Sequence, residues 1–135
     1  MKTSLLIDIL RDPEKIKHFS VKDWNLFLRQ ANSAKMLSRL ANRLDEYNLF
    51  SAIPEKIKNH INSELVKVAH LHTQVNQEVA ELNELFNALK IKAIYLKGTA
   101  YLLANLPLIE GRFFSDIDIL LNQSDIAKVE IALKC

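Results

Sequence analysis

Two aspartates, Asp116 and Asp118, stand one residue apart in an apolar stretch and are the best candidates for chemistry in this chain. On a strand, both carboxylates would point to one side while Ile117 and Ile119 point to the other. Like charges on one face repel each other unless a cation lies between them. Hard carboxylate oxygens suit Mg²⁺ or Mn²⁺ bound together with a substrate's phosphates. The pair therefore predicts a divalent-metal site, and the alternative is a strand end with two solvated carboxylates.

A second stretch, upstream of the aspartates, carries groups that suit a phosphate ligand. Gly98 lets the backbone approach a phosphate closely, and the amides of a following helix start attract an anion. Thr99 adds a hydroxyl donor. Lys97 and Arg112 are cations that match a triphosphate. The alternative for Arg112 is an ion pair with a carboxylate that orders its loop.

Together, the run LKGT at 96–99, Arg112 and the run SDIDIL at 115–120 resemble the nucleotidyltransferase superfamily, in particular the branch described as uncharacterised nucleotidyltransferases. The pattern of that branch is LKG…R…DIDLLV, and the resemblance covers residues 94–133. It implies transfer of a nucleoside monophosphate from an NTP to a hydroxyl acceptor, with Mg²⁺ or Mn²⁺ as cofactor. The implied site consists of the metal ligands and catalytic residues Asp116 and Asp118 and the nucleotide-binding residues Lys97, Gly98, Thr99 and Arg112.

Two features depart from the superfamily's pattern. Residues 100–115 separate the glycine turn from the aspartates, which is a longer gap than usual. Active members take a third carboxylate from a later strand, whereas Asp125 and Glu130 fall in a predicted helix. We therefore expect the N-terminal portion of a longer nucleotidyltransferase, or a degenerate one, weak or inactive alone.

Two regions of different sequence character must position these residues. Residues 1–90 have helical patterning and contain no glycine, whereas β-branched stretches appear after them. The predicted fold class is α+β: a helical region over 1–90 with one long helix, then an incomplete nucleotidyltransferase core over 91–135. The core has the order β-α-β-α, with strands predicted over 91–96 and 113–121 and a helix over 98–104.

Capping residues mark two of the predicted helices. Ser20 is typical of an N-cap, and apolar residues at helical spacing extend that helix to about Tyr47. Ser124 is expected to cap the last helix. The side chains expected on the inner face of that helix are Ile126, Val129 and Leu133.

The long helix is predicted from Pro54 to Lys90, with apolar side chains at steps of three and four residues. At the standard rise it is about 55 Å long, more than a small domain covers. We expect a partner helix or a missing part of the protein to cover this stripe. A homo-oligomer through the helix or through the open edges of the sheet would provide such cover. His72 lies in the stripe without helical neighbours that bind metal, which favours a structural role.

Composition limits the possible functions further. Eighteen basic against sixteen acidic residues give a net charge of +2, too balanced for a nucleic-acid surface. The one cysteine, Cys135, excludes an intrachain disulfide and a thiolate metal cluster. No apolar run reaches the roughly 18 residues of a membrane span. We expect a cytoplasmic protein without membrane contact.

Two other functions are compatible with the sequence. The glycine turn and aspartates would also serve a non-catalytic nucleotide-binding or antitoxin-like partner module. Alternatively, the chain is a helical oligomerisation protein whose working part is the helix over 54–90. Substituting Asp116 and Asp118 separates these readings, because the oligomerisation protein does not depend on them.

Overall fold

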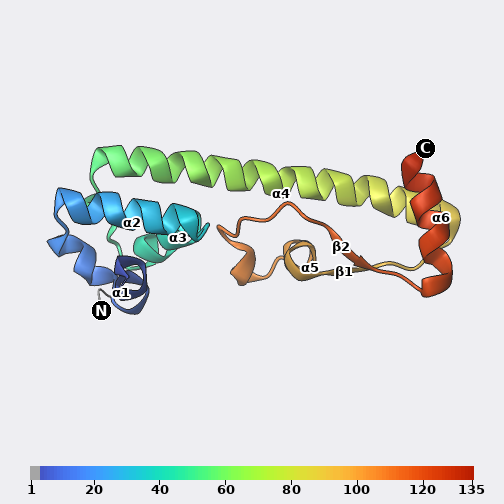
Figure 1. The fold of residues 1–135 in the computed structure, drawn as a ribbon, viewed down its shortest axis with the longest axis horizontal. Helices are drawn as coiled ribbons and strands as arrows, with labels where there is room; N and C mark the ends of the chain where they lie inside the picture. The colour runs from blue at the N-terminus through green and yellow to red at the C-terminus, as the bar shows by residue number, and fades with distance from the viewer. Residues whose placement is uncertain (1–3) are drawn as a thin grey trace. The chain divides into compact units, whose positions relative to one another are not determined.

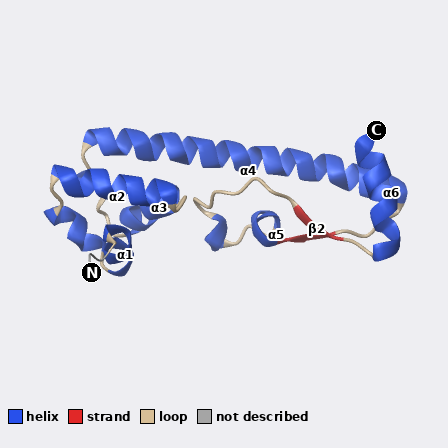
Figure 2. Cartoon of the chain, viewed as in Figure 1, coloured by secondary structure: helices blue, strands red, loops and turns tan. Residues whose placement is uncertain are grey.

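The computed structural model describes residues 4–135 and confirms the α+β fold, with helices predominating (Figure 1, Figure 2). Contacts divide the chain into two compact units: residues up to Ala69 with Glu110–Phe113, and His70–Ile109 with Phe114–Cys135. The sequence predicted a domain boundary at residue 90. Such a boundary separates parts that fold independently, and it stays a prediction. The elements in chain order are α1 (Leu5–Arg11), η1 (Pro13–His18), α2 (Val21–Ser33), α3 (Leu37–Glu46), η2 (Phe50–Ala52), α4 (Glu55–Leu89), β1 (Ile94–Leu96), α5 (Lys97–Leu103), η3 (Pro107–Ile109), β2 (Asp118–Leu120) and α6 (Gln123–Lys134).

The N-terminal unit is organised around an aromatic core. Phe27 is fully buried, and its ring meets Phe19 and Trp24 edge-on at centroid distances of 5.7 and 5.9 Å, the geometry that aromatic pairs prefer. The predicted cap of α2 is confirmed. The Ser20 Oγ accepts a hydrogen bond from the Asp23 N–H, and the Asp23 carboxylate accepts one from the Ser20 N–H at 2.8 Å. This reciprocal pair fixes where α2 begins.

The single helix predicted over 20–47 is wrong, because the chain turns at Lys35 and begins a second helix, α3. Lys35 has φ +53°, its N–H bonds to the Asn32 C=O, and the Met36 N–H bonds to the Ala31 C=O. These two bonds form a Schellman ending, which usually uses glycine. The helical region contains no glycine, so the sequence carried no sign of the break. The same pair of bonds follows three later helices, at Asn48, Lys90 and Asn105.

The long helix α4 is confirmed, and its apolar stripe is buried within the single chain. The expectation that a partner must cover it is therefore wrong, although self-association itself stays a prediction. No helix within residues 4–135 is both long and apolar enough to cross a membrane. The buried stripe residues are Ile57, Ile61, Val68, Val75, Val79 and Phe86.

The C-terminal unit packs two antiparallel strands against the end of α4 and against α6 (Figure 1). Tyr95 of β1 and Ile119 of β2 lie opposite each other and face a cluster built on Phe86 and Val129. The Tyr95 hydroxyl donates a hydrogen bond to Asn83 Oδ1 of α4 at 2.6 Å. One face of the sheet is thus attached to the long helix by both apolar and polar contacts.

Both strands are shorter than the ranges predicted, 91–96 and 113–121, because only three residue pairs align in the ladder. Alternating apolar residues favour a strand, but a ladder also needs a partner at every position. On the face opposite Tyr95, Ile94 and Leu120 are 58% and 54% exposed. This face of the sheet is not covered by the described part of the chain.

The last helix, α6, differs from its prediction at two points. Its N-cap is Asn122, so Ser124 lies inside the first turn and caps nothing. Of the three side chains expected to face inward, Val129 is buried, whereas Ile126 and Leu133 are exposed. The helix therefore joins the unit chiefly through the turn that carries Val129.

Candidate functional site

The turn that begins α5 and the segment leading into β2 meet through three residue pairs within the C-terminal unit. The antiparallel register explains the meeting, because β1 ends at Leu96 directly opposite Asp118. The two stretches that suggested chemistry in the sequence are therefore neighbours in space. The pairs are Lys97 with Asp118, Gly98 with Phe114, and Thr99 with Asp116.

Lys97 combines an unusual backbone with an exposed charge. Its φ is +53°, yet it begins a helix, whereas the other non-glycine residues with positive φ among those described follow helix ends. Its Nζ lies 3.3 Å from Asp118 Oδ2, with both side chains well exposed. An exposed pair of this kind stabilises a fold very little. Strain that no helix cap explains is a reason to suspect a functional role at Lys97.

Gly98 is required for the packing of the Phe114 ring, independently of any role in binding a ligand. A Cβ at this position would lie 2.7 Å from Cδ2 of Phe114, so the aromatic ring rests against the glycine backbone. The same ring meets the half-buried His72 of α4 at a centroid distance of 5.3 Å. Phe114 was not identified from the sequence. The sequence did carry a signal, because Phe114 precedes Asp116 by two residues, the same spacing that separates Asp116 from Asp118.

Thr99 is fully buried, and its Oγ1 donates to the backbone carbonyl of Asp116 at 3.4 Å. This contact holds the main chain of Asp116 while leaving its carboxylate exposed. Asp116 precedes β2, so the simple alternation assumed for one continuous strand does not apply to it. In this structure Thr99 positions the aspartate segment, and its contact with nucleotide stays a prediction.

The two aspartates fit a divalent ion that arrives with a nucleotide better than one held by protein alone. The described residues contain no cluster of three or more His, Cys, Asp or Glu side chains placed to hold a metal. Mg²⁺ commonly takes one or two carboxylates and completes its shell with phosphates and water. Lys97 already places a cation beside Asp118, which indicates that this carboxylate accommodates positive charge. The donor set therefore suits Mg²⁺ or Mn²⁺ with an NTP.

Arg112 lies in the other compact unit, on the segment Glu110–Phe113. Gly111 has φ +67°, and a Cβ there would lie 2.9 Å from backbone atoms of Ser38 and Arg39. Only glycine lets this segment approach the start of α3 so closely. Arg112 is half-buried there, and its role toward a nucleotide stays a prediction.

Comparison with known proteins identifies one family. The family described as uncharacterised nucleotidyltransferase matches residues 20–135, which include both the helical region and the paired motifs. No curated protein matches the chain, and no solved structure does. The family match agrees with the resemblance to nucleotidyltransferases found in the sequence. The contact between the 97–99 turn and the 114–118 segment agrees with it as well. The chain belongs to the family described as uncharacterised nucleotidyltransferase.

Proposed function

We propose that the chain binds an NTP with Mg²⁺ or Mn²⁺ at Asp116 and Asp118 and transfers its nucleoside monophosphate to a hydroxyl acceptor. The new bond joins the acceptor oxygen to the α-phosphorus, the bond to the β-phosphate breaks, and pyrophosphate and the hydroxyl proton are released. Family membership supports the reaction class. The observation that supports the location is the meeting of the 97–99 turn with the 114–118 segment. The nucleophile belongs to the acceptor, so the chain needs no nucleophilic side chain of its own.

The carboxylates of Asp116 and Asp118 would hold the ion. When bound, that ion would offset charge on the phosphate oxygens and favour ionisation of the attacking hydroxyl. Lys97 would leave Asp118 and bind a phosphate oxygen, and this exchange costs little because the pair is exposed. The family pattern also implies a role for Arg112 toward the nucleotide, and that role stays a prediction.

Gly98 and Thr99 would act mainly by holding the aspartate segment in place. Both are buried, and Phe114 rests on the glycine backbone. A phosphate would reach the Gly98 backbone only after the Phe114 ring moved. Direct binding of nucleotide by this turn therefore requires a displacement of the Phe114 ring, which also contacts His72.

Calorimetric titration with ATP and GTP tests the binding step. We expect saturable binding that requires Mg²⁺ or Mn²⁺ and weakens at least about tenfold in the Asp116→Asn, Asp118→Asn double variant, since each charged contact contributes on the order of 1 kcal/mol or more. Glu130→Gln is the matched control, because this acid is exposed on α6 outside the site. Equal binding by the double variant and the control would contradict the proposal.

Transfer is a separate claim and needs its own assay. The folded chain is incubated with Mg²⁺ and α-labelled ATP, with a short RNA bearing a free 3′ hydroxyl and with the chain itself as acceptors. Label transfer that depends on Asp116 and Asp118 supports the enzyme. Metal-dependent binding without any transfer would instead assign the chain as a nucleotide-binding module.

A further inference from the structure

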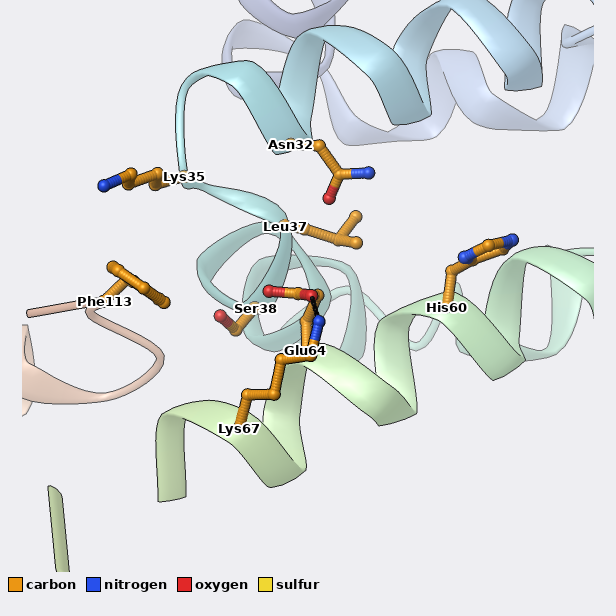
Figure 3. Close-up of a pocket in the computed structure, with 8 residues that line it drawn as sticks. All are labelled: Asn32, Lys35, Leu37, Ser38, His60, Glu64, Lys67 and Phe113. Atoms are coloured by element: carbon orange, nitrogen blue, oxygen red, sulfur yellow. Dashed lines mark hydrogen bonds and ion pairs between the residues drawn. The ribbon is translucent and has the colours of Figure 1, made fainter. Parts of the chain in front are cut away.

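A polar cleft of about 540 Å³ lies wholly within the N-terminal unit (Figure 3). Its lining comes from the end of α2, the start of α3, one face of α4 and Phe113. The close approach of Gly111 to the start of α3 brings the neighbouring Phe113 to the cleft. The cleft shares no residue with the candidate site at Asp116 and Asp118, and its role is not explained by the proposed function.

The start of α3 presents backbone donors at this cleft. The first helical bond runs from the Leu40 N–H to the Met36 C=O, so the N–H groups of residues 37–39 precede the hydrogen-bonded part of the helix. No side chain caps this end of α3. N–H groups without a helical acceptor at the start of a ten-residue helix favour an anion.

Ser38 gives independent support for a ligand. Its side chain lines the cleft, the residue is only 3% exposed, and its hydroxyl makes no hydrogen bond with any described residue. The hydroxyl nevertheless keeps some contact with the cleft, since no fully buried side-chain oxygen in the described chain is without a partner. Nearly buried hydroxyls are normally hydrogen-bonded. Ser38 therefore has an unused donor among the side chains that line the cleft (Figure 3).

The charges around the cleft favour a negative ligand. Lys35 is held by its turn with its ammonium 4.8 Å from the centre of the Phe113 ring. Lys67 reaches the cleft from α4 and pairs with Glu64 at 2.8 Å. The lining thus contains two lysines and one carboxylate, which leaves an excess of positive charge. Because the Lys67–Glu64 pair is exposed, an anion would compete for the lysine at little cost.

We propose that this cleft binds the phosphate group of a small phosphorylated molecule. The phosphate lies at the start of α3, where it accepts hydrogen bonds from the amides of Leu37 and Ser38 and from the Ser38 hydroxyl. Lys35 and Lys67 neutralise its charge. The organic part lies against Leu37 and Phe113, the apolar side chains of the cleft.

Amide NMR of the full chain tests the proposal, with a chelator present so that no metal-dependent site contributes. We expect inorganic phosphate to give saturable shifts at the amides of Leu37, Ser38 and Arg39. Phenyl phosphate should bind more tightly, because its ring adds contact with Phe113. Uniform, unsaturable shifts would overturn the site, and equal affinity for the two probes would overturn the placement of the organic part.

Matched variants separate binding from general effects. Ser38→Ala should keep its stability, because the hydroxyl has no partner to lose, and should bind phosphate about tenfold more weakly. Ser33→Ala, an exposed serine of α2, is its control. Lys35→Gln should also weaken binding, whereas Lys56→Gln on the exposed face of α4 should not. Equal losses in the cleft variants and their controls would contradict the proposal, whatever the result at Asp116 and Asp118.

Discussion

Lys97 is the residue where backbone strain and candidate chemistry coincide. A left-handed conformation costs a residue with a side chain about 1–2 kcal/mol, and glycine escapes this cost. Lys97→Gly should therefore be more stable to urea than Lys97→Ala by about 1 kcal/mol. Both variants lose the ammonium and should bind Mg²⁺–ATP about fivefold more weakly. An alanine variant as stable as the glycine variant would contradict the strain argument.

Gly98 and Phe114 form the tightest contact of the candidate site. Gly98→Ala places a methyl group where the ring now lies and should reduce the free energy of unfolding by about 1–3 kcal/mol. Adding Phe114→Leu makes room for the methyl group, so the double variant should lose less than the sum of the single changes. Urea unfolding of all four chains gives the coupling. Strict additivity would show that the two residues do not press on each other.

For single residues, the sequence predicted which residues belong to the candidate site but not how these residues contact one another. Residue types and spacing identified Asp116, Asp118 and the glycine turn, because charged residues within an apolar stretch can be recognised from the sequence alone. The burial of Thr99 and the ring over Gly98 depend on how two distant stretches pack. Packing between segments leaves no local signal beyond the alternation of Phe114 with the aspartates.

Among the elements, α2 depends on its capping box. Hydrogen bonds from the Ser20 backbone and then its hydroxyl lower the pKa of the Asp23 carboxyl below its ordinary 3.8. A carboxyl with a lowered folded pKa contributes stability above its unfolded pKa and loses it as pH falls through the folded value. Asp23→Asn should therefore destabilise the chain near neutral pH and have no effect in strong acid. Urea unfolding across pH measures the difference, and a pH-independent loss would contradict the assigned cause.

Ser20→Ala provides a companion test that does not titrate. Losing an N-cap hydroxyl costs about 1 kcal/mol. The exposed Ser33, the last residue of α2, serves as control. Comparable losses from Ser20→Ala and Ser33→Ala would show that the box does not set the start of α2.

Phe86 attaches the sheet to α4. It is buried and lies in the cluster that receives Tyr95 and Ile119. Phe86→Ala should cost about 3–5 kcal/mol and speed hydrogen exchange of the β1 amides. Leu89→Ala, on a more exposed turn of the same helix, should cost far less. Equal effects would show that Phe86 does not anchor the sheet.

Element types were more predictable than element ends. The capping residue Ser20 correctly gave the start of α2, and the helical periodicity correctly gave α4 and α6 as helices. The break at Lys35 was missed because a lysine occupies the left-handed position that usually reveals itself as glycine. Strand lengths were overestimated because the ladder is limited by its partner and not by local preference.

Over the described residues, the sheet and α6 each expose several large apolar side chains, whereas most of the α4 stripe is buried. We therefore expect self-association, where concentration promotes it, to use the face that carries Ile94 and Leu120. Leu120→Lys should shift sedimentation toward the monomer, whereas Val66→Lys on exposed α4 should leave it unchanged. The reverse result would restore the long helix as the contact. A wild-type monomer at every concentration would contradict self-association altogether.

The central claim is that the 97–99 turn and the aspartate segment form one nucleotide and metal site. The most direct test is paramagnetic broadening of amide NMR signals by trace Mn²⁺ in the presence of ATP. We predict that broadening is strongest at residues 97–99 and 116–118 and disappears in the Asp116→Asn, Asp118→Asn variant. Broadening centred on other acidic groups, such as Glu78 and Glu81 of α4, or unchanged in that variant, would contradict the account.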